Sequence, residues 1–506
     1  MEQFLYKPNT ERAEYNFWMA YPACEAFALS SLGYMWLFKI ASTLEGINAE
    51  RVYTDTNTTC IKPQDVSSIA FSLSFDFDFM GVLELLEKYN IPFYSTERDE
   101  TSPLIFAGGP VITTNPEPYK LFFDFLIIGD GEEIFIKVLN ILKQKLSKKE
   151  TLEKLAILDG IYIPNKTKTV KKITENLNSV IYTPILSEKS YFKETFVIEV
   201  ARGCMNRCAF CTASYTNLPF RYYQYEKIIE AIDLGLKYTN KIALLGAQIS
   251  AHPDFDRIMD YLRKKIENGE NIELGISSLR TDAVTPELIK TLVLGGQKNS
   301  TIAIEAASER LRKFINKNLK EEQILNAIKI SRENGLKGLK IYSMIGIPSE
   351  TEEDIEEFIN LAKKIKSENK GFDITFSFST FVPKPQTPLQ WAKREDTKTL
   401  EKKQKYLEKA LAKLGIGSKF SSAKWDYWQT LLSRGDESLS KFLIDVYKNG
   451  GKNSAYKTAI KENNIILTKP IGGYDINEPL PWDVIENYPP KNLLINEYNR
   501  LQKYTI

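Results

Sequence analysis

Between residues 193 and 385 the sequence alternates six times between a short apolar run and a helical stretch. The apolar runs have the length of buried strands, and the stretches between them carry an apolar face at helical spacing. Repeated units of this kind predict a sheet of parallel strands joined by right-handed helical crossovers. Side chains that carry chemistry are expected at the carboxyl ends of such strands. The predicted strands are Phe196–Ala201, Lys241–Gly246, Ile272–Ser277, Ser300–Ala306, Lys340–Ile345 and Asp373–Phe381.

Three of the five cysteines lie directly after the first of these strands. Cys204, Cys208 and Cys211 are spaced as C-x3-C-x2-C on the loop that leaves the strand. Three thiolates are one ligand short of a closed tetrahedral zinc site, but they suit a cubane iron–sulfur cluster whose fourth iron is open to another ligand. The alternative is three inert core cysteines, because a free cysteine is often simply a small buried residue.

With Phe210 just before the last cysteine, the motif resembles the cluster motif of the radical S-adenosylmethionine (SAM) superfamily. The resemblance implies a [4Fe-4S] cluster held by the three cysteines, with SAM bound to the open iron. It implies that an electron from the cluster cleaves SAM to methionine and a 5′-deoxyadenosyl radical, and it places Phe210 beside these cofactors. The six strand–helix units then correspond to the partial (β/α)6 TIM-type barrel of that superfamily.

The resemblance also assigns roles at the ends of the second and third strands. Gly246 matches a turn that receives the amino group of SAM, although Ala247 and Gln248 depart from the Gly-Gly-Glu-like pattern found there in many members. Arg280 follows the third strand and is a candidate partner for the carboxylate of SAM, because arginine binds carboxylates in a bidentate manner. The alternative for Arg280 is a structural salt bridge to a neighbouring helix.

Two further candidates follow the fourth and fifth strands. Glu305 interrupts an apolar strand where the barrel opens, and an acidic group there can accept hydrogen bonds from ribose hydroxyls or from the ammonium of SAM. Gly346 begins a Gly-Ile-Pro turn that, by resemblance, lies beside the adenine. We therefore expect Gly246, Arg280, Glu305 and Gly346 at one rim with the cysteines.

Strands and helices also alternate from about residue 15 to 145, and two of the strands run into glycine turns. This pattern predicts a doubly wound, Rossmann-like sheet that binds ligands at the carboxyl ends of its strands. Gly108, Gly109, Gly129 and Gly131 in these turns resemble those of the cobalamin-binding-type domain that precedes many radical SAM barrels. No histidine precedes His252, so the usual histidine ligand to cobalt is missing. Two alternatives stay open: cobalamin bound without a protein ligand to cobalt, or a scaffold or substrate-docking domain.

The resemblance extends along nearly the whole chain. It divides the chain into a Rossmann-like domain over 1–150, a linker over 151–192, the radical SAM barrel over 193–394 and a mainly helical domain over 395–506. The overall fold class is therefore α/β. The segments that carry the wider resemblance are Ser72–Phe75, Pro116–Pro118, Gly129–Glu132, Val382–Pro385, Leu432–Asp436 and Pro481–Asp483.

Composition and charge limit the kinds of partner that we expect this protein to bind. The formal net charge of +2 argues for neither a nucleic-acid partner nor an anionic membrane surface. There is no apolar run of membrane-spanning length, and the first residues lack the pattern of a secretory signal. A thiolate-held cluster fits a reducing compartment, so we expect a cytoplasmic protein. The resemblance implies an electron donor of flavodoxin or ferredoxin type; the substrate is a small molecule or a macromolecule.

Competing functions divide into two classes. The first is an enzyme that cleaves SAM, with either cobalamin-dependent methyl transfer to an unactivated carbon or a cobalamin-free radical modification or rearrangement, RNA modification included. Methylthiolation is less favoured, because Cys24 and Cys60 are too few to hold a second cluster. The second class is a non-catalytic iron–sulfur or zinc protein. No Cys or His lies in residues 212–251 to complete a zinc site, and this favours the enzyme.

Overall fold

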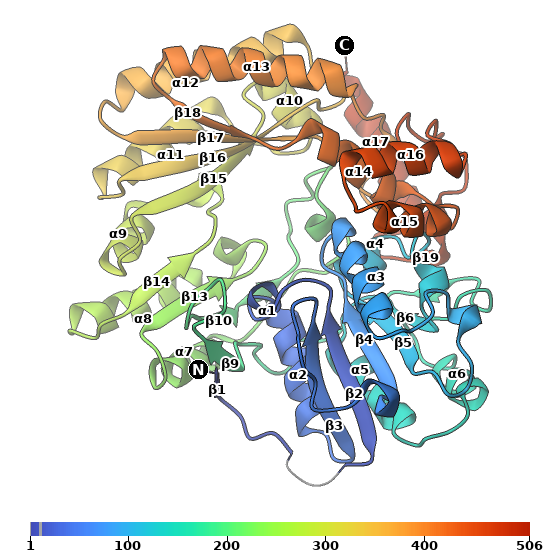
Figure 1. Ribbon diagram of the computed structural model, residues 1–506. Helices are drawn as coiled ribbons and strands as arrows, with labels where there is room; N and C mark the ends of the chain where they lie inside the picture. Colours follow the sequence, from blue (N-terminus) through green and yellow to red (C-terminus); the bar gives the residue numbers. More distant parts are fainter. Residues whose placement is uncertain (1, 10–12, 506) are drawn as a thin grey trace.

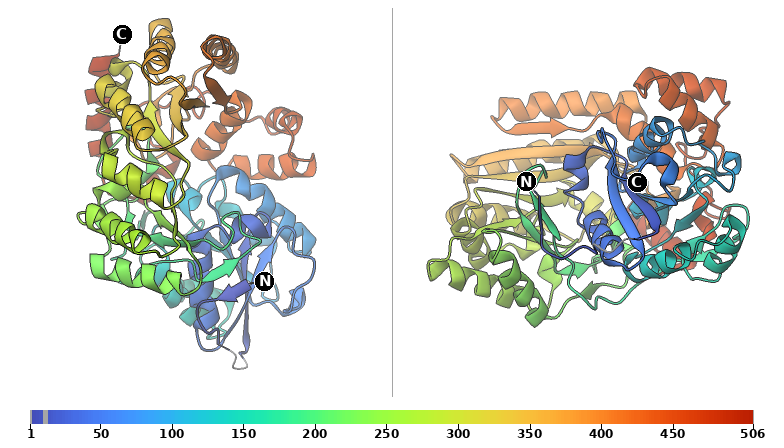
Figure 2. Two further views of the ribbon diagram at one scale, coloured as in Figure 1. Left: turned by 90° about the vertical axis from the view of Figure 1, so that its left-hand side faces the viewer. Right: turned by 60° about the horizontal axis from the view of Figure 1, so that its bottom comes forward.

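The computed structural model describes residues 2–9 and 13–505. An N-terminal sheet and a barrel-like pair of sheets face each other, and helices from the C-terminal part cover one side of the N-terminal sheet (Figure 1). Figure 2 shows the same arrangement from two further sides. The α/β class and its Rossmann-like and TIM-type parts are as the sequence predicts.

The N-terminal sheet has six strands in the order β3-β2-β4-β5-β6-β7. The first five are parallel and β7 is antiparallel to β6. Helices α2, α5 and α6 pack on one face and α3 on the other, so the sheet is doubly wound. Its elements are β2 (Tyr15–Tyr21), α1 (Glu25–Ala28), α2 (Leu32–Thr43), β3 (Ile47–Tyr53), β4 (Ser68–Ser72), α3 (Phe79–Lys88), β5 (Leu104–Gly108), α4 (Pro110–Thr114), β6 (Phe125–Ile127), α5 (Glu132–Leu142), α6 (Lys148–Leu155) and β7 (Ile161–Tyr162).

The barrel consists of two parallel sheets, β10-β13-β14 and β15-β16-β17-β18, joined by a bridge between Leu279 and Ile302. All six predicted strands are present, and a short seventh strand, β18, extends the second sheet. The elements are β10 (Phe196–Glu199), α7 (Tyr225–Leu236), β13 (Lys241–Leu245), α8 (Phe255–Glu267), β14 (Glu273–Ile276), α9 (Pro286–Leu294), β15 (Asn299–Glu305), α10 (Glu309–Phe314), α11 (Glu321–Glu333), β16 (Gly338–Ile345), α12 (Glu352–Glu368), β17 (Asp373–Thr380), α13 (Thr397–Lys413) and β18 (Gly417–Phe420).

Local signals place the helix starts where the sequence predicts them. At the start of α12 the backbone N–H of Thr351 donates to Asp354 at 2.9 Å, and the Thr351 hydroxyl accepts from the Asp354 N–H at 3.4 Å. This reciprocal capping satisfies two otherwise unpaired N–H groups. At α9, Thr285 accepts from the Leu288 N–H at 3.2 Å and Pro286 occupies the first helical position, where no N–H is required.

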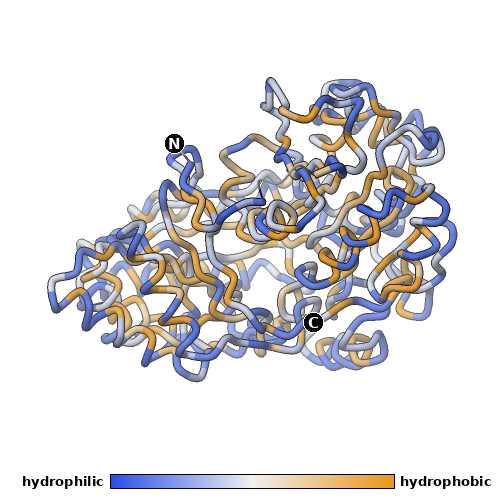
Figure 3. Tube along the Cα trace, turned by 90° about the horizontal axis from the view of Figure 1, so that it is seen from below, coloured by the Kyte–Doolittle hydropathy of each residue, from blue (hydrophilic) through white to orange (hydrophobic). Residues whose placement is uncertain are grey.

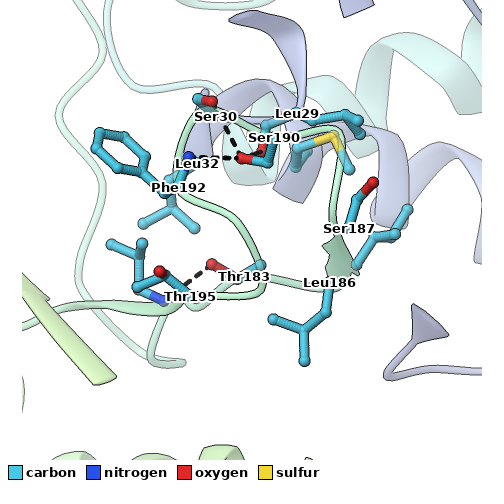
Figure 4. A pocket seen from close by; sticks show the side chains of 12 residues that line it. Leu29, Ser30, Leu32, Thr183, Leu186, Ser187, Ser190, Phe192 and Thr195 are labelled. Carbon is cyan, nitrogen blue, oxygen red and sulfur yellow. Dashed lines mark hydrogen bonds between the residues drawn. The ribbon is translucent and has the colours of Figure 1, made fainter. Parts of the chain in front are cut away.

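The predicted linker pairs with both ends of the chain. Besides β7, it contains β8 (Val170–Lys171), which is parallel to β19 (Ile485–Glu486), and β9 (Ile185–Ser187), which is antiparallel to β1 (Glu2–Phe4). Figure 4 shows where it meets the N-terminal helices: the hydroxyls of Ser30 and Ser190 are 3.1 Å apart. The cavity there is only about 20 Å³, so it has room for about one water and for no larger ligand.

The C-terminal helices share a core with the N-terminal sheet. Trp428 of α14 (Ala423–Arg434) and Phe442 of α15 (Leu439–Lys448) are buried in one cluster with Phe71, Ile105 and Leu126. Helix α16 (Asn453–Glu462) completes this layer, and α17 (Lys491–Leu501) lies beside the barrel. Hydrophobic and hydrophilic stretches alternate along the trace (Figure 3). No helix among the described residues is long and apolar enough to cross a membrane.

Candidate functional site

The three cysteines lie on the loop that follows β10 and the short β11 (Ala201–Arg202). Cys204 and Cys208 are buried and Cys211 is half-buried. The loop begins at Gly203, whose φ is +84° and where a Cβ would lie 2.4 Å from the carbonyl oxygen of Asn217. Only glycine fits this tight approach. The loop therefore turns sharply at the carboxyl end of the first barrel strand.

Segments from distant parts of the barrel hold the loop in place. The Ala209 N–H donates to the Ile315 carbonyl at 2.9 Å, and the Leu389 N–H donates to the Ala209 carbonyl at 3.2 Å. The Asn316 side chain donates to the Arg207 carbonyl at 2.8 Å. Because these partners follow β15 and β17, the loop is fixed across the carboxyl ends of the barrel strands.

Phe210 belongs to a small apolar cluster under this loop. It packs with residues that directly follow three barrel strands, Ala306, Ile347 and Phe381. Phe210 therefore packs among residues that follow strand ends, and its place beside the cofactors stays a prediction. Ile347 also places the Gly-Ile-Pro turn at this rim.

The three thiols are donors of the kind that an iron–sulfur cluster takes, and their role as its ligands stays a prediction. The pKa of Cys208 is raised to about 12, chiefly by burial and also by the neighbouring thiols and Glu305, while Lys317 opposes the shift. Burial likewise raises the pKa of Cys211. Buried thiolates of this kind are stable only with a cationic partner, and metal binding displaces their protons. Within the described residues, no three His, Cys, Asp or Glu side chains are arranged to hold a single metal ion.

The only histidine is committed elsewhere. Nε2 of His252 lies 2.7 Å from the Tyr223 carbonyl, and Nδ1 accepts from the Asp254 N–H at 3.0 Å. Both ring nitrogens are therefore occupied by backbone groups. His252 has no free nitrogen for a metal at the cysteine loop.

Gly246 directly follows β13 and lies against β11, just before the cysteine loop, where a Cβ would be 2.9 Å from the Ala201 carbonyl oxygen. Two residues on, the Oε1 atom of Gln248 accepts from the Cys204 thiol at 3.2 Å and from the Asn206 amide at 2.5 Å. The sequence identified Gln248 only as a departure from a family pattern. Its contact with a candidate ligand had no signal in the sequence.

Glu305 and Lys317 form a buried pair next to Cys208. Glu305 has a φ of +66°, unusual for a residue other than glycine, and its carboxylate lies 3.2 Å from the Lys317 ammonium. Burial lowers the pKa of Lys317, but Glu305 and Cys208 outweigh this effect and the pKa is raised. Arg280 is near enough to oppose that rise, and it forms a 2.6 Å ion pair with Asp282. The structure thus brings Glu305 to the cysteines together with Lys317, which the sequence did not single out.

Gly346 directly follows β16 and packs against α13. Its φ is +76°, its N–H donates to Glu350 at 2.9 Å, and a Cβ would lie 2.5 Å from Leu400. Glu350 is buried, which raises its pKa to about 7 although Lys403 lies 2.7 Å away. Glycine at 346 is thus explained by packing against α13, and the contacts described for this residue are with Glu350, Glu395 and Leu400.

A cavity of about 420 Å³ lies between the N-terminal sheet and the cysteine loop. All four predicted glycines, Gly108, Gly109, Gly129 and Gly131, line one side of it. The opposite side is lined by residues directly after Cys211, namely Thr212, Ala213, Thr216 and Asn217. The carboxyl ends of the N-terminal strands therefore open toward the loop that carries the thiols.

Chain packing accounts for two of these glycines. A Cβ at Gly129 would lie 2.2 Å from the Ile173 carbonyl oxygen, and one at Gly109 would lie 2.6 Å from that of Leu73. Both have φ above +100°. These turns bring the backbone itself to the wall of the cavity.

Ion pairs join the two halves beside this cavity. Arg202 of the barrel lies 3.0 Å from Asp130, 2.6 Å from Glu132 and 2.8 Å from Glu199. Arg221 lies 2.6 Å from Asp130. The acidic residues of the Gly-Asp-Gly-Glu segment are thus paired with barrel arginines, and the sequence had identified only its glycines.

Comparison with known sequences matches both halves. Residues 33–164 match the family described as "Radical SAM proteins, N-terminal", and residues 198–362 match the "Radical SAM superfamily". An uncharacterised protein of Methanocaldococcus jannaschii is 32% identical over 434 residues, which cover 84% of this chain and 88% of that protein.

Two solved structures share the fold. OxsB, a cobalamin-dependent SAM radical enzyme solved with aqua-cobalamin and SAM, has a TM-score of 0.56 at 14% identity, covering 98% of this chain and 79% of that one. TsrM of Kitasatospora setae, a radical SAM methyltransferase solved with tryptophan and a SAM analogue, has a TM-score of 0.54 at 11% identity, covering 71% and 72%. The likeness extends over the N-terminal sheet and the barrel together in OxsB.

Proposed function

This chain belongs to the radical SAM superfamily, and from that membership we propose that it is a cobalamin-dependent methyltransferase acting on an unactivated carbon. The observation that carries the proposal is the cavity between the strand-end glycines and the cysteine loop. A cofactor in that cavity would lie directly beside the residues that follow Cys211. The two solved enzymes with the same fold, one with cobalamin bound and one a methyltransferase, support it.

In this proposal Cys204, Cys208 and Cys211 hold the [4Fe-4S] cluster. When bound, the cluster and SAM supply the 5′-deoxyadenosyl radical chemistry of the superfamily. The protein positions the cofactors and excludes water. The burial of Cys204 and Cys208 supports their role, since the covering loop shields the sulfur atoms from solvent.

Charged residues at the rim hold SAM in position. Glu305 accepts hydrogen bonds from its ammonium or ribose hydroxyls, and Lys317 and Arg280 attract its carboxylate. Gly246 presents backbone groups beside the loop, and the Gly346 turn approaches the adenine through Ile347. The support is that Glu305 and Lys317 form a pair next to Cys208, with Arg280 close by.

The N-terminal domain holds cobalamin against the backbone of Gly108, Gly109, Gly129 and Gly131. Hydroxyl-bearing residues of the same cavity, Ser72, Ser74, Thr113 and Thr114 among them, offer hydrogen-bond partners for its polar groups. Because both nitrogens of His252 are occupied, the protein binds cobalamin without a histidine ligand to cobalt.

Methylthiolation fits the molecule less well. Of the two cysteines outside the loop, Cys24 is half-buried and Cys60 is exposed. Two thiols cannot hold a second cluster through three thiolates.

A thiolate-held cluster also fits a reducing compartment, so the proposal places the enzyme in the cytoplasm.

Anaerobic purification with hydroxocobalamin tests the proposal. The protein should retain the cobalamin visible spectrum through gel filtration. Ser72→Phe, which fills the cavity without removing a described hydrogen bond, should abolish retention. Ser454→Phe on the exposed side of α16 is the matched control and should retain the cofactor. A wild-type protein that elutes free of cobalamin would contradict the proposal, and so would equal retention by Ser72→Phe.

A further inference from the structure

The cysteine loop has an outer side that faces solvent. Residues after Cys211 line the cavity toward the N-terminal domain, but Met205 and Arg207, between the first two cysteines, are exposed. Met205 is 57% exposed, which is high for a large apolar side chain. Two exposed residues of the loop thus lie in the chain between the buried Cys204 and Cys208.

Two other segments lie beside this outer side. Asn316, between α10 and α11, donates to the Arg207 carbonyl at 2.8 Å. Arg310 of α10 donates to the Tyr504 carbonyl at 2.9 Å, which brings in the end of the chain. We use the name outer loop face for the exposed residues Met205, Arg207, Lys313, Lys320 and Lys503 of these three segments, together with the half-buried Arg500.

The outer loop face is positively charged. Two acidic neighbours are paired, because Glu309 lies 2.8 Å from Lys313 and Glu497 lies 2.8 Å from Arg500, and the exposed Glu322 near Lys320 adds one negative charge. Arg207, Lys320 and Lys503 have no ion pair among the described residues, and all three are exposed. A surface with exposed cations around one apolar side chain is complementary to an acidic protein, which it attracts over a distance of about 8 Å at physiological salt.

We infer that the outer loop face docks an acidic one-electron carrier protein, for which flavodoxin is the probe. The inference rests on the proposed function, because radical SAM enzymes need an electron donor. In the complex the carrier loses one electron and the cluster behind the loop gains it, with no transfer of a proton or a group. Two residues of this face, Met205 and Arg207, are exposed and lie between Cys204 and Cys208 in the chain.

The test measures binding and reduction separately. The variant Lys320→Glu/Lys503→Glu reverses two charges outside the cysteine loop, and Lys298→Glu/Lys337→Glu makes the same charge change at the opposite end of the barrel strands. The first variant should bind flavodoxin about tenfold more weakly and lose most of the salt dependence of the wild-type affinity. The control variant should bind like the wild type. Arg207→Glu, measured for binding alone, should also weaken the complex.

5′-Deoxyadenosine formation gives the second readout. With reduced flavodoxin, Lys320→Glu/Lys503→Glu should form it more slowly than the wild type; with dithionite, which needs no docking surface, the rates should match. Equal binding by both double variants would overturn the inference, and so would an equal loss of activity with both reductants. If the wild type forms no 5′-deoxyadenosine with dithionite, the proposed function fails, whereas the binding comparison still decides the docking surface.

Discussion

Gln248 and Lys317 show what single residues add to the cysteine motif. The spacing of Cys204, Cys208 and Cys211 predicted a cluster loop, because three thiols on one turn have a recognisable pattern. Gln248 and Lys317 reach the same loop from other strand ends, and nothing in their local sequence marks them. Residues that meet only through tertiary packing had no signal that a single sequence could reveal.

Gln248→Glu should weaken the binding of the cluster to the protein. The change places a carboxylate 3.2 Å from the Cys204 sulfur, where its negative charge opposes a thiolate ligand. Changes next to a metal ligand commonly cost about tenfold or more in metal affinity. Iron and sulfide retained after anaerobic reconstitution and desalting against a chelator measure the effect. The exposed Gln144→Glu is the control, and equal retention by both variants would count against the assigned contact.

At the scale of elements, periodicity predicted most of the structure. All six predicted barrel strands are present because each is an apolar run buried by helices on its outer side. The strands β3 and β18 had no such signal. The sequence of β3, Ile47–Tyr53, includes Asn, Glu and Arg, and β18, Gly417–Phe420, is short and half-exposed. Both are edge strands, defined by pairing with a neighbour more than by their own side chains.

The two glycines of the Gly-Asp-Gly segment should differ in their tolerance of a side chain. At Gly129 a Cβ would lie 2.2 Å from a backbone oxygen and φ is +111°, so Gly129→Ala should destabilise the fold by about 2–4 kcal/mol. At Gly131 the nearest atom would be 3.7 Å away, so Gly131→Ala should change stability by less than about 1 kcal/mol. Urea denaturation compares them, and similar midpoints would contradict this account of the turn.

At the scale of the whole molecule, the N-terminal sheet depends on the end of the chain. Its expected boundary at residue 150 and the boundary of the C-terminal segment at 395 stay predictions, but the two regions share one hydrophobic core. The sequence could not reveal this, because an amphipathic helix does not specify which sheet its apolar face will cover. Ion pairs from Arg202 and Arg221 then join the sheet to the barrel.

Phe442→Ala should destabilise the N-terminal sheet and the C-terminal helices together. Phe442 is fully buried in the shared core, and deleting its ring should cost about 3–5 kcal/mol. Limited proteolysis should then cut the N-terminal domain faster as well as the C-terminal helices. Ile466→Ala, at a position that is 73% exposed, should leave both cleavage rates unchanged. Faster cleavage of the C-terminal helices alone would mean that the regions are independent.

Formation of 5′-deoxyadenosine from SAM tests the central claim most directly. The protein is reconstituted anaerobically with iron and sulfide, reduced with dithionite and supplied with SAM. We predict that the wild type forms 5′-deoxyadenosine, that Cys60→Ala does so equally, and that Cys208→Ala forms none and retains no cluster. A wild-type protein that carries the cluster but forms no 5′-deoxyadenosine, or a Cys208→Ala variant that remains active, would contradict the account.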